Sequence, residues 1–263
     1  MMDINLINKT ALVCGGSQGL GLATAKELAL LGATVILASR TEEKLIEAVK
    51  LLSSAAGQQH SYLVMDLSVP APAKIIVENW VQKNGPIHIL INNAGGPPAG
   101  PMIDTDAAEL EKAFLSHVIS GHLLTQVLIP GMQQAGYGRI INIVSTSVKQ
   151  PINGLGISNT VRAAMANWAK TLANEIGHDG ITVNNVLPGY TSTDRLKYLF
   201  SKQAAQQNVQ PEDIEKSIIN TIPAKRLGKP EEFGAVAAFL CTPAAAYING
   251  VNIPVDGGRT AGL

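Results

Sequence analysis

The sequence is poor in cysteine, and the two cysteines that it has are not arranged as a pair. Cys14 and Cys241 are the only cysteines among 263 residues, and they lie far apart in the chain. Their spacing is not that of metal ligands, so no metal site is expected. A reduced, cytoplasmic protein is the expectation. Because Cys14 falls in an apolar run, a packed core thiol is favoured there over a nucleophile.

The sequence also lacks an excess of charge and a long apolar run. Lysine plus arginine and aspartate plus glutamate each number 20, so the formal net charge is zero. No basic stripe with interleaved aromatic residues points to nucleic acid. No apolar run approaches the roughly 20 residues of a membrane span, and residues 1–10 lack the pattern of a signal peptide. We expect neither nucleic acid nor a membrane among the partners.

Apolar, strand-like runs alternate with helical patterns along a chain that is 46% hydrophobic. Strands are expected at 9–14, 34–38, 62–65, 87–91, 139–144, 181–187 and 251–255. Helices are expected at 20–31, 41–53, 73–83, 106–132, 154–176 and 231–240, with one or two short helices between 190 and 225. The alternation predicts the α/β class, with a doubly wound parallel sheet of seven strands covered by helices on both faces. No linker interrupts it, so residues 1–263 are expected to form a single domain.

A glycine-rich turn joins the first expected strand to the first expected helix. Its glycines stand as Gly15-x-x-x-Gly19-x-Gly21. Such a turn needs backbone angles that glycine adopts easily, and it lets a phosphate approach the main chain at the start of a helix. A turn without a ligand is the alternative, but the position after the first strand of an α/β chain favours a dinucleotide site of the Rossmann type. The loops after the other strands should meet this turn in one crevice.

Several further motifs occur in a fixed order along the chain. They are Asp66-Leu67 and the segments at 92–95, 138–145, 184–189, 226–232 and 255–258. Together with the glycine turn, they make the chain resemble the short-chain dehydrogenase/reductase family over essentially its whole length. The resemblance is strongest to the 3-oxoacyl-acyl-carrier-protein reductases.

The resemblance implies a role for each motif in binding a dinucleotide. The pyrophosphate would be held by Gly15, Ser17, Gln18, Gly19, Leu20 and Gly21. Asp66 and Leu67 would flank the adenine, Asn93, Ala94 and Gly95 would line the ribose, and Pro188, Gly189 and Thr193 would meet the nicotinamide side. For Asp66, a cap on the helix that follows is the alternative.

The end of the second strand indicates which dinucleotide is bound. A carboxylate at this place binds the ribose 2′-hydroxyl of NAD and repels a 2′-phosphate. This chain has Ser39 and Arg40 instead. A guanidinium matches a phosphate in charge and in its fork of donors, so NADP is expected in preference to NAD, although a solvated surface arginine is the alternative.

The expected catalytic residues depart from the family pattern. The resemblance implies a tetrad of Asn, Ser, Tyr and Lys, in which Tyr is the acid or base. Ser145 matches the family Ser, but Ser158 stands at the Tyr position, Arg162 at the Lys position and His117 at the Asn position. A serine hydroxyl is far less acidic than a phenol, and general acid–base help is worth roughly 10²–10⁴ in rate.

Other groups are candidates for the missing proton. Arg162 could still bond ribose hydroxyls, but it cannot release a proton as Lys does. His117 titrates near neutrality and could supply a proton through water, although a packed histidine is the favoured interpretation. Tyr190 lies close to the expected substrate and would form an apolar wall or act as a displaced acid.

Three hypotheses follow for the function. The first is an NADP-dependent oxidoreductase that reduces a carbonyl in a 3-oxoacyl thioester or another small ketone, with an atypical proton donor. The second is a dinucleotide-binding protein without redox turnover, acting as a scaffold, a partner subunit or a sensor. The third is non-redox chemistry such as that of a lyase or isomerase. The resemblance further implies a homotetramer, and the segment at about 190–225 is expected to form a substrate lid.

Overall fold

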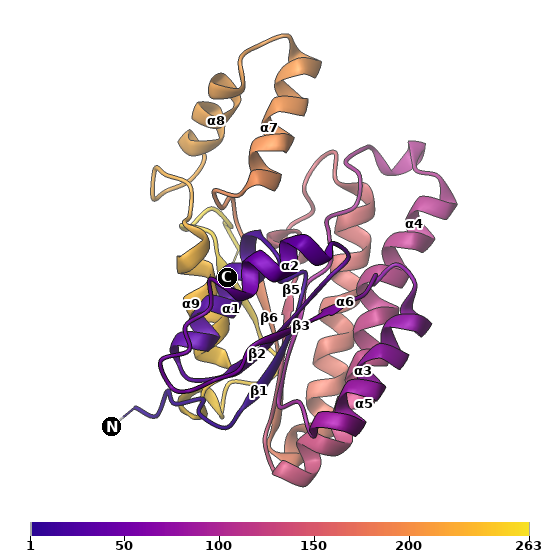
Figure 1. Ribbon diagram of the computed structural model, residues 1–263. Coiled ribbons are helices and arrows are strands. Elements are labelled where there is room, and N and C mark those ends of the chain that lie inside the picture. The colour runs from indigo at the N-terminus through magenta and orange to yellow at the C-terminus, as the bar shows by residue number, and fades with distance from the viewer. Residues whose placement is uncertain (1, 263) are drawn as a thin grey trace.

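The computed structural model describes residues 2–262, and its centre is a seven-stranded sheet between two layers of helices (Figure 1). The strands lie in the order β3-β2-β1-β4-β5-β6-β7, and each neighbouring pair is parallel. Their bounds are β1 Thr10–Cys14, β2 Thr34–Ser39, β3 Ser61–Val64, β4 Ile89–Asn92, β5 Gly138–Ile143, β6 Ile181–Pro188 and β7 Asn252–Val255. This confirms the predicted doubly wound parallel sheet, whose order reverses between β1 and β4.

Helices cover both faces of the sheet. They are α1 Gly19–Leu30, α2 Glu42–Val49, α3 Pro70–Asn84, α4 Ala107–Phe114, α5 Ser120–Ala135, α6 Gly156–Ile176, α7 Asp194–Gln207, α8 Pro211–Asn220 and α9 Pro230–Leu240. The prediction placed the end of α2 too late, because Leu51 and Leu52 already close it with main-chain bonds to the third residue before them. It placed the start of α3 too late, since Pro70 suits the first turn of a helix.

The helix predicted at 106–132 is present but is interrupted by one wider turn. A π-helical turn, Leu115–Ile119, separates α4 from α5 and contains His117. The helical segment Ala107–Ala135 has 29 residues and contains an 18-residue window with a mean hydropathy of 1.3, enough by length and composition alone to cross a membrane. In this fold, however, α5 packs against α3 and β5 as a core helix.

Alternate residues of each central strand supply two cores, one on each face. Ala11 and Val13 of β1 pack with α1 and α9, whereas Leu12 and Cys14 pack on the side of α3, α5 and α6. The predicted burial of Cys14 is confirmed, and burial raises the pKa of its thiol to about 12. An apolar environment therefore keeps this thiol protonated.

Two helices stand beyond the carboxyl ends of the strands, at the top of Figure 1. α7 and α8 pack on each other through a small apolar cluster of Leu196, Phe200, Ala204 and Ile214. These are the short helices predicted between 190 and 225. Their position over the carboxyl edge of the sheet is where a substrate lid is expected.

Candidate active site

The turn after β1 leaves no room for a side chain on Gly15 or Gly21. Gly15 has φ +57°, and a Cβ built on it would lie 2.6 Å from the carbonyl oxygen of Asn93. A Cβ on Gly21 would lie 2.2 Å from the carbonyl oxygen of Gly15. Gly19 has φ +58° and opens α1. The turn therefore presents bare main chain at the start of a helix, together with Ser17, Gln18 and Leu20.

Two segments distant in sequence lie against this turn. The side-chain amide of Asn93, just after β4, donates to the carbonyl of Gly15 over 3.3 Å. The methyl carbon of Thr193 lies 3.9 Å from where a Gly19 Cβ would stand. Gly189, which follows β6, donates its main-chain N–H to the carbonyl of Val255 over 3.0 Å. Asn93 after β4 and Thr193 after β6 thus both lie at the glycine turn.

Asp66 and Leu67 belong to a turn between β3 and α3. The carboxylate of Asp66 accepts from the N–H of Ser68 over 2.9 Å. Because α3 begins at Pro70 and is preceded by Val69, Asp66 does not cap that helix, and the capping alternative is wrong. The carbonyl of Leu67 accepts from the hydroxyl of Ser120 over 2.6 Å, which fixes this turn to α5.

The end of β2 carries a buried hydroxyl and an exposed cation. The hydroxyl of Ser39 is buried and has no hydrogen-bond partner within residues 2–262, and Arg40 beside it is exposed. The ammonium group of Lys44 in α2 lies 3.4 Å from the side-chain oxygen of Gln18 in the glycine turn. The sequence analysis missed Lys44, although its place one helical turn after Arg40 was a usable signal. An orphaned donor and two cations fit a phosphate group.

The two serines of the expected tetrad lie after β5 and in the first turn of α6. The hydroxyl of Ser145 accepts from the N–H of Ser147 over 3.1 Å and caps a short 3₁₀ helix, Thr146–Val148. Ser158 is half-buried, and its hydroxyl has no hydrogen-bond partner in the described part of the chain. Both hydroxyls retain their proton for a ligand.

Tyr190 is held by the lid. Its ring centroid lies 6.3 Å from that of Phe200, and the guanidinium carbon of Arg259 lies 4.9 Å from its centroid. The ring also packs against the apolar cluster between α7 and α8. This packing agrees with the interpretation of Tyr190 as an apolar wall.

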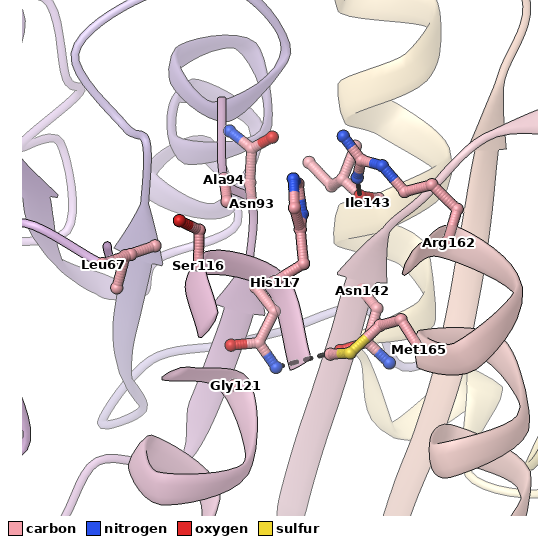
Figure 2. A pocket seen from close by; sticks show the side chains of 11 residues that line it. Leu67, Asn93, Ala94, Ser116, His117, Gly121, Asn142, Ile143, Arg162 and Met165 are labelled. Atoms are coloured by element: carbon pink, nitrogen blue, oxygen red, sulfur yellow. Dashed lines mark hydrogen bonds between the residues drawn. The ribbon is translucent and has the colours of Figure 1, made fainter. Parts of the chain in front are cut away.

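His117 and Arg162 approach one small cavity from two helical segments (Figure 2). The imidazole Nε2 of His117 lies 3.1 Å from the carbonyl of Gly95 and donates to it. Burial, and then the charge of Arg162, hold the pKa of His117 well below its usual value. The ring is therefore neutral at neutral pH, so it lacks the acidic proton that a charged histidine would supply.

Arg162 is buried and cationic. One terminal nitrogen, Nη1, donates to the carbonyl of Ile143 over 2.5 Å. Burial lowers the pKa of the guanidinium to about 10, so it stays protonated at neutral pH. The cavity beside it has a volume of about 10 Å³, which is the room of roughly one water molecule. Its lining includes Leu67, Asn93 and Ala94 of the predicted cofactor residues.

A row of asparagines crosses the sheet beneath this cavity. The side-chain amide of Asn92 donates to Asn142 over 2.9 Å, that of Asn142 to Asn185 over 2.8 Å, and that of Asn185 to Asn252 over 2.8 Å. These residues are exact neighbours in the register of β4, β5, β6 and β7. Every amide points the same way, so the row fixes Asn92 and Asn142 in the cavity wall.

Comparisons with known proteins agree with this architecture. A family model described as enoyl-(acyl carrier protein) reductase matches residues 15–260. Dehydrogenase/reductase SDR family member 4 of Oryctolagus cuniculus is 32% identical and aligns over 98% of this chain and 96% of its own length. The 3-oxoacyl-[acyl-carrier-protein] reductase of Pseudomonas aeruginosa is 34% identical, with 97% of this chain and 98% of its own length aligned.

A solved structure extends the agreement to three dimensions. L-Sorbose reductase from Gluconobacter frateurii, complexed with NADPH and L-sorbose, gives a TM-score of 0.93 at 30% identity and covers 100% of both chains. The matches span nearly the whole chain. The chain therefore belongs to the short-chain dehydrogenase/reductase family.

Proposed function

We propose that this protein is an NADP-dependent oxidoreductase that reduces the carbonyl of a 3-oxoacyl thioester or another small ketone. The observation that carries the proposal is the turn from Gly15 to Gly21 at the start of α1, where a Cβ on Gly15 or Gly21 would lie 2.6 Å or less from a main-chain oxygen. Arg40 and Lys44 supply cations at the place expected for a 2′-phosphate. The solved relative that reduces L-sorbose holds NADPH, which supports the same cofactor here.

The residues of this chain would divide the work of binding. The turn would hold the pyrophosphate, Ser39 and Arg40 the 2′-phosphate, and Pro188, Gly189 and Thr193 the nicotinamide side. When bound, NADPH supplies a hydride. Ser145 and Ser158 would orient the carbonyl oxygen, since both hydroxyls retain a proton for a ligand.

Proton delivery is the unusual part of this proposal. His117 is neutral and so offers no charged imidazole, and the ring of Tyr190 packs against the apolar cluster of the lid. Solvent water acting through Ser158 would then supply the proton. The expected rate is lower than that of a phenol-containing relative by roughly 10²–10⁴.

The direct test is NADPH oxidation with a panel of 3-oxoacyl thioesters, ketones and quinones. Turnover above the background rate with at least one of them supports the proposal. Absence of turnover across the panel, in a protein that binds NADPH, contradicts it and favours the second candidate function.

That second candidate is a dinucleotide-binding protein without redox turnover. The observation that favours it is the replacement of the expected tyrosine and lysine by Ser158 and Arg162. Measuring NADPH affinity and thermal stabilisation beside activity separates the two functions. Failure to bind any dinucleotide contradicts both.

We also propose a cytoplasmic homotetramer. The small residues Ala163 and Ala164 on α6 are not buried within the chain and would permit close approach of a second copy. Light scattering that shows a monodisperse monomer would overturn this assembly.

A further inference from the structure

The lid, residues 190–227, has a small apolar core of its own. The cluster that joins α7 to α8 is completed by Tyr190, Ile218 and Leu227, so every member comes from this segment. Within residues 2–262, none of the other apolar clusters includes a residue of α7 or α8. Figure 1 shows the two helices standing away from the sheet. The lid therefore shares no apolar core with the sheet in the described chain, and such a unit can move as one body.

The two chain segments that enter and leave the lid are paired at its base. Gly228 donates its main-chain N–H to the carbonyl of Tyr190 over 2.9 Å, and Ser192 donates to the carbonyl of Gly228 over 2.9 Å. Lys225, just before this pairing, has φ +54°, a conformation that residues other than glycine rarely adopt. The bonds fix the base of the lid, and the helices beyond it can swing about this base as about a hinge.

One side chain of the lid reaches across to the loop after β4. Arg195, in the first turn of α7, donates from Nη2 to the main-chain carbonyls of Gly96 and Pro97, over 3.3 Å in each case. The start of the same helix also touches the glycine turn, because the methyl carbon of Thr193 lies 3.9 Å from where a Gly19 Cβ would stand. The first turn of α7 therefore contacts both loops from which the expected dinucleotide contacts come.

The place of Arg195 is unfavourable for the helix itself. A helix dipole favours anions in the first turn and opposes cations there, and the neighbouring Asp194 is the residue type that suits this place. None of the ion pairs in the described residues includes Arg195. The ring of Tyr198, one turn along, has its centroid 5.8 Å from the guanidinium carbon. The bonds to the loop after β4 are thus the contacts that give this cation a purpose at the start of α7.

We propose that Arg195 is a latch that holds the lid closed over the crevice, and that a dinucleotide enters and leaves only when this latch opens. The inference rests on the proposed function, because it takes the crevice as the dinucleotide site. Both bonds come from one exposed side chain, so they can break and form again repeatedly. Because the latch bonds to the protein and not to the dinucleotide, it slows entry and release to a similar degree.

The first test follows binding and release of NADPH by stopped-flow fluorescence of the full-length protein. Arg195→Met removes the donors but keeps a long side chain, so both rate constants should rise roughly 3- to 10-fold while the Kd stays within about twofold. Arg195→Lys should give a smaller rise, since it keeps the charge. Lys202→Met is the matched control, because it removes a cation from another exposed position of α7, and it should leave both rate constants unchanged.

The second test needs no ligand. The native Cys14 and Cys241 are fully buried, so two fluorophores can be attached to cysteines introduced at exposed positions, by Glu43→Cys on α2 and Gln206→Cys on α7. Single-molecule energy transfer then reports how far the lid stands from α2. A population at longer distance should grow when Arg195→Met is added and should not grow in the control variant.

Two results would overturn the latch directly. They are NADPH rate constants in Arg195→Met that equal those of the wild type, and a distance distribution that the substitution leaves unchanged. Faster release with unchanged entry and weaker affinity would make Arg195 a contact of the dinucleotide, which also overturns the inference. Failure of NADPH to bind the wild-type protein would contradict the proposed function, and the distance measurement would still test the latch.

Discussion

The crevice at the carboxyl edge of the sheet has two sides that differ in how fully they match the family pattern. On the side of β1 and β2, the glycines of the turn, the main chain at the start of α1 and the cation Arg40 are all in place. On the side of β5 and α6, Ser145 matches the family pattern, but Ser158 and Arg162 stand where the resemblance places the tyrosine and lysine that handle the proton. Binding of a dinucleotide and transfer of a proton are therefore separate properties of this fold, and one can change while the other stays.

The largest expected effect comes from restoring the proton-handling side. The double variant Ser158→Tyr with Arg162→Lys should raise the rate of ketone reduction by roughly 10²–10⁴, because a phenol is a far better general acid than a serine hydroxyl. Steady-state NADPH oxidation measures the gain, and the affinity for NADPH should stay within a few-fold of wild type. An unchanged rate in a folded double variant would mean that the site geometry, and not only the donor, has diverged.

The next effect comes from damaging the binding side. Gly21→Ala places a Cβ 2.2 Å from the carbonyl oxygen of Gly15, so the turn must shift. NADPH affinity, followed by the fluorescence of the bound cofactor, should fall by roughly 100-fold. Gly100→Ala is the matched control, since a Cβ there meets nothing within 4 Å and Gly100 is not among the predicted cofactor residues. Similar affinities for the two variants would contradict the assignment of the turn.

A smaller effect is expected at the end of β2. Arg40→Asp replaces a cation by an anion where the 2′-phosphate is expected, so NADPH affinity should fall by roughly tenfold or more while NADH affinity holds or rises. Parallel titrations of the two cofactors measure this change in preference. Lys44→Gln should lower NADPH affinity less, because Lys44 lies within α2 and is further from the end of β2 than Arg40 is. Loss of both affinities to the same degree would argue against a role for Arg40 in selectivity.

The difference between the two sides also appears in what the sequence could predict. The parallel sheet and the glycine turn follow from local patterns, since alternation of strands and helices indicates a parallel sheet and a strand–glycine–helix sequence indicates the turn. The wider turn around His117 was not predicted, because its residues suit an ordinary helix equally well. The contact between His117 and the carbonyl of Gly95 distinguishes the wider turn from an ordinary helix.

The asparagine row was beyond the reach of the sequence for another reason. Each of Asn92, Asn142, Asn185 and Asn252 is an unremarkable polar residue in or near a strand. They become one network only through the register of four strands that lie far apart in the chain. The surroundings of Arg162 could not be predicted for the same reason, because they come from segments that lie far apart in the chain.

The smallest predicted effect concerns pH. The folded pKa of His117 is held well below its usual 6.5, chiefly by burial, so the unfolded chain binds this proton more readily than the folded one. Its contribution to stability is therefore fully present above about pH 6.5 and declines as the pH falls toward the folded pKa. Chemical denaturation between about pH 5 and 7 should show less decline in His117→Gln. An identical decline in both proteins would contradict a depressed pKa.

One measurement tests the central claim most directly, namely that the intact binding side still delivers a hydride across a site without a phenol. Wild-type protein is loaded with NADPH that carries deuterium at the reactive carbon, incubated with a 3-oxoacyl thioester or a small ketone, and the products are examined by mass spectrometry. The account predicts an alcohol with one deuterium on the former carbonyl carbon, formed slowly but above the rate without protein. Bound NADPH with no deuterated product would contradict it.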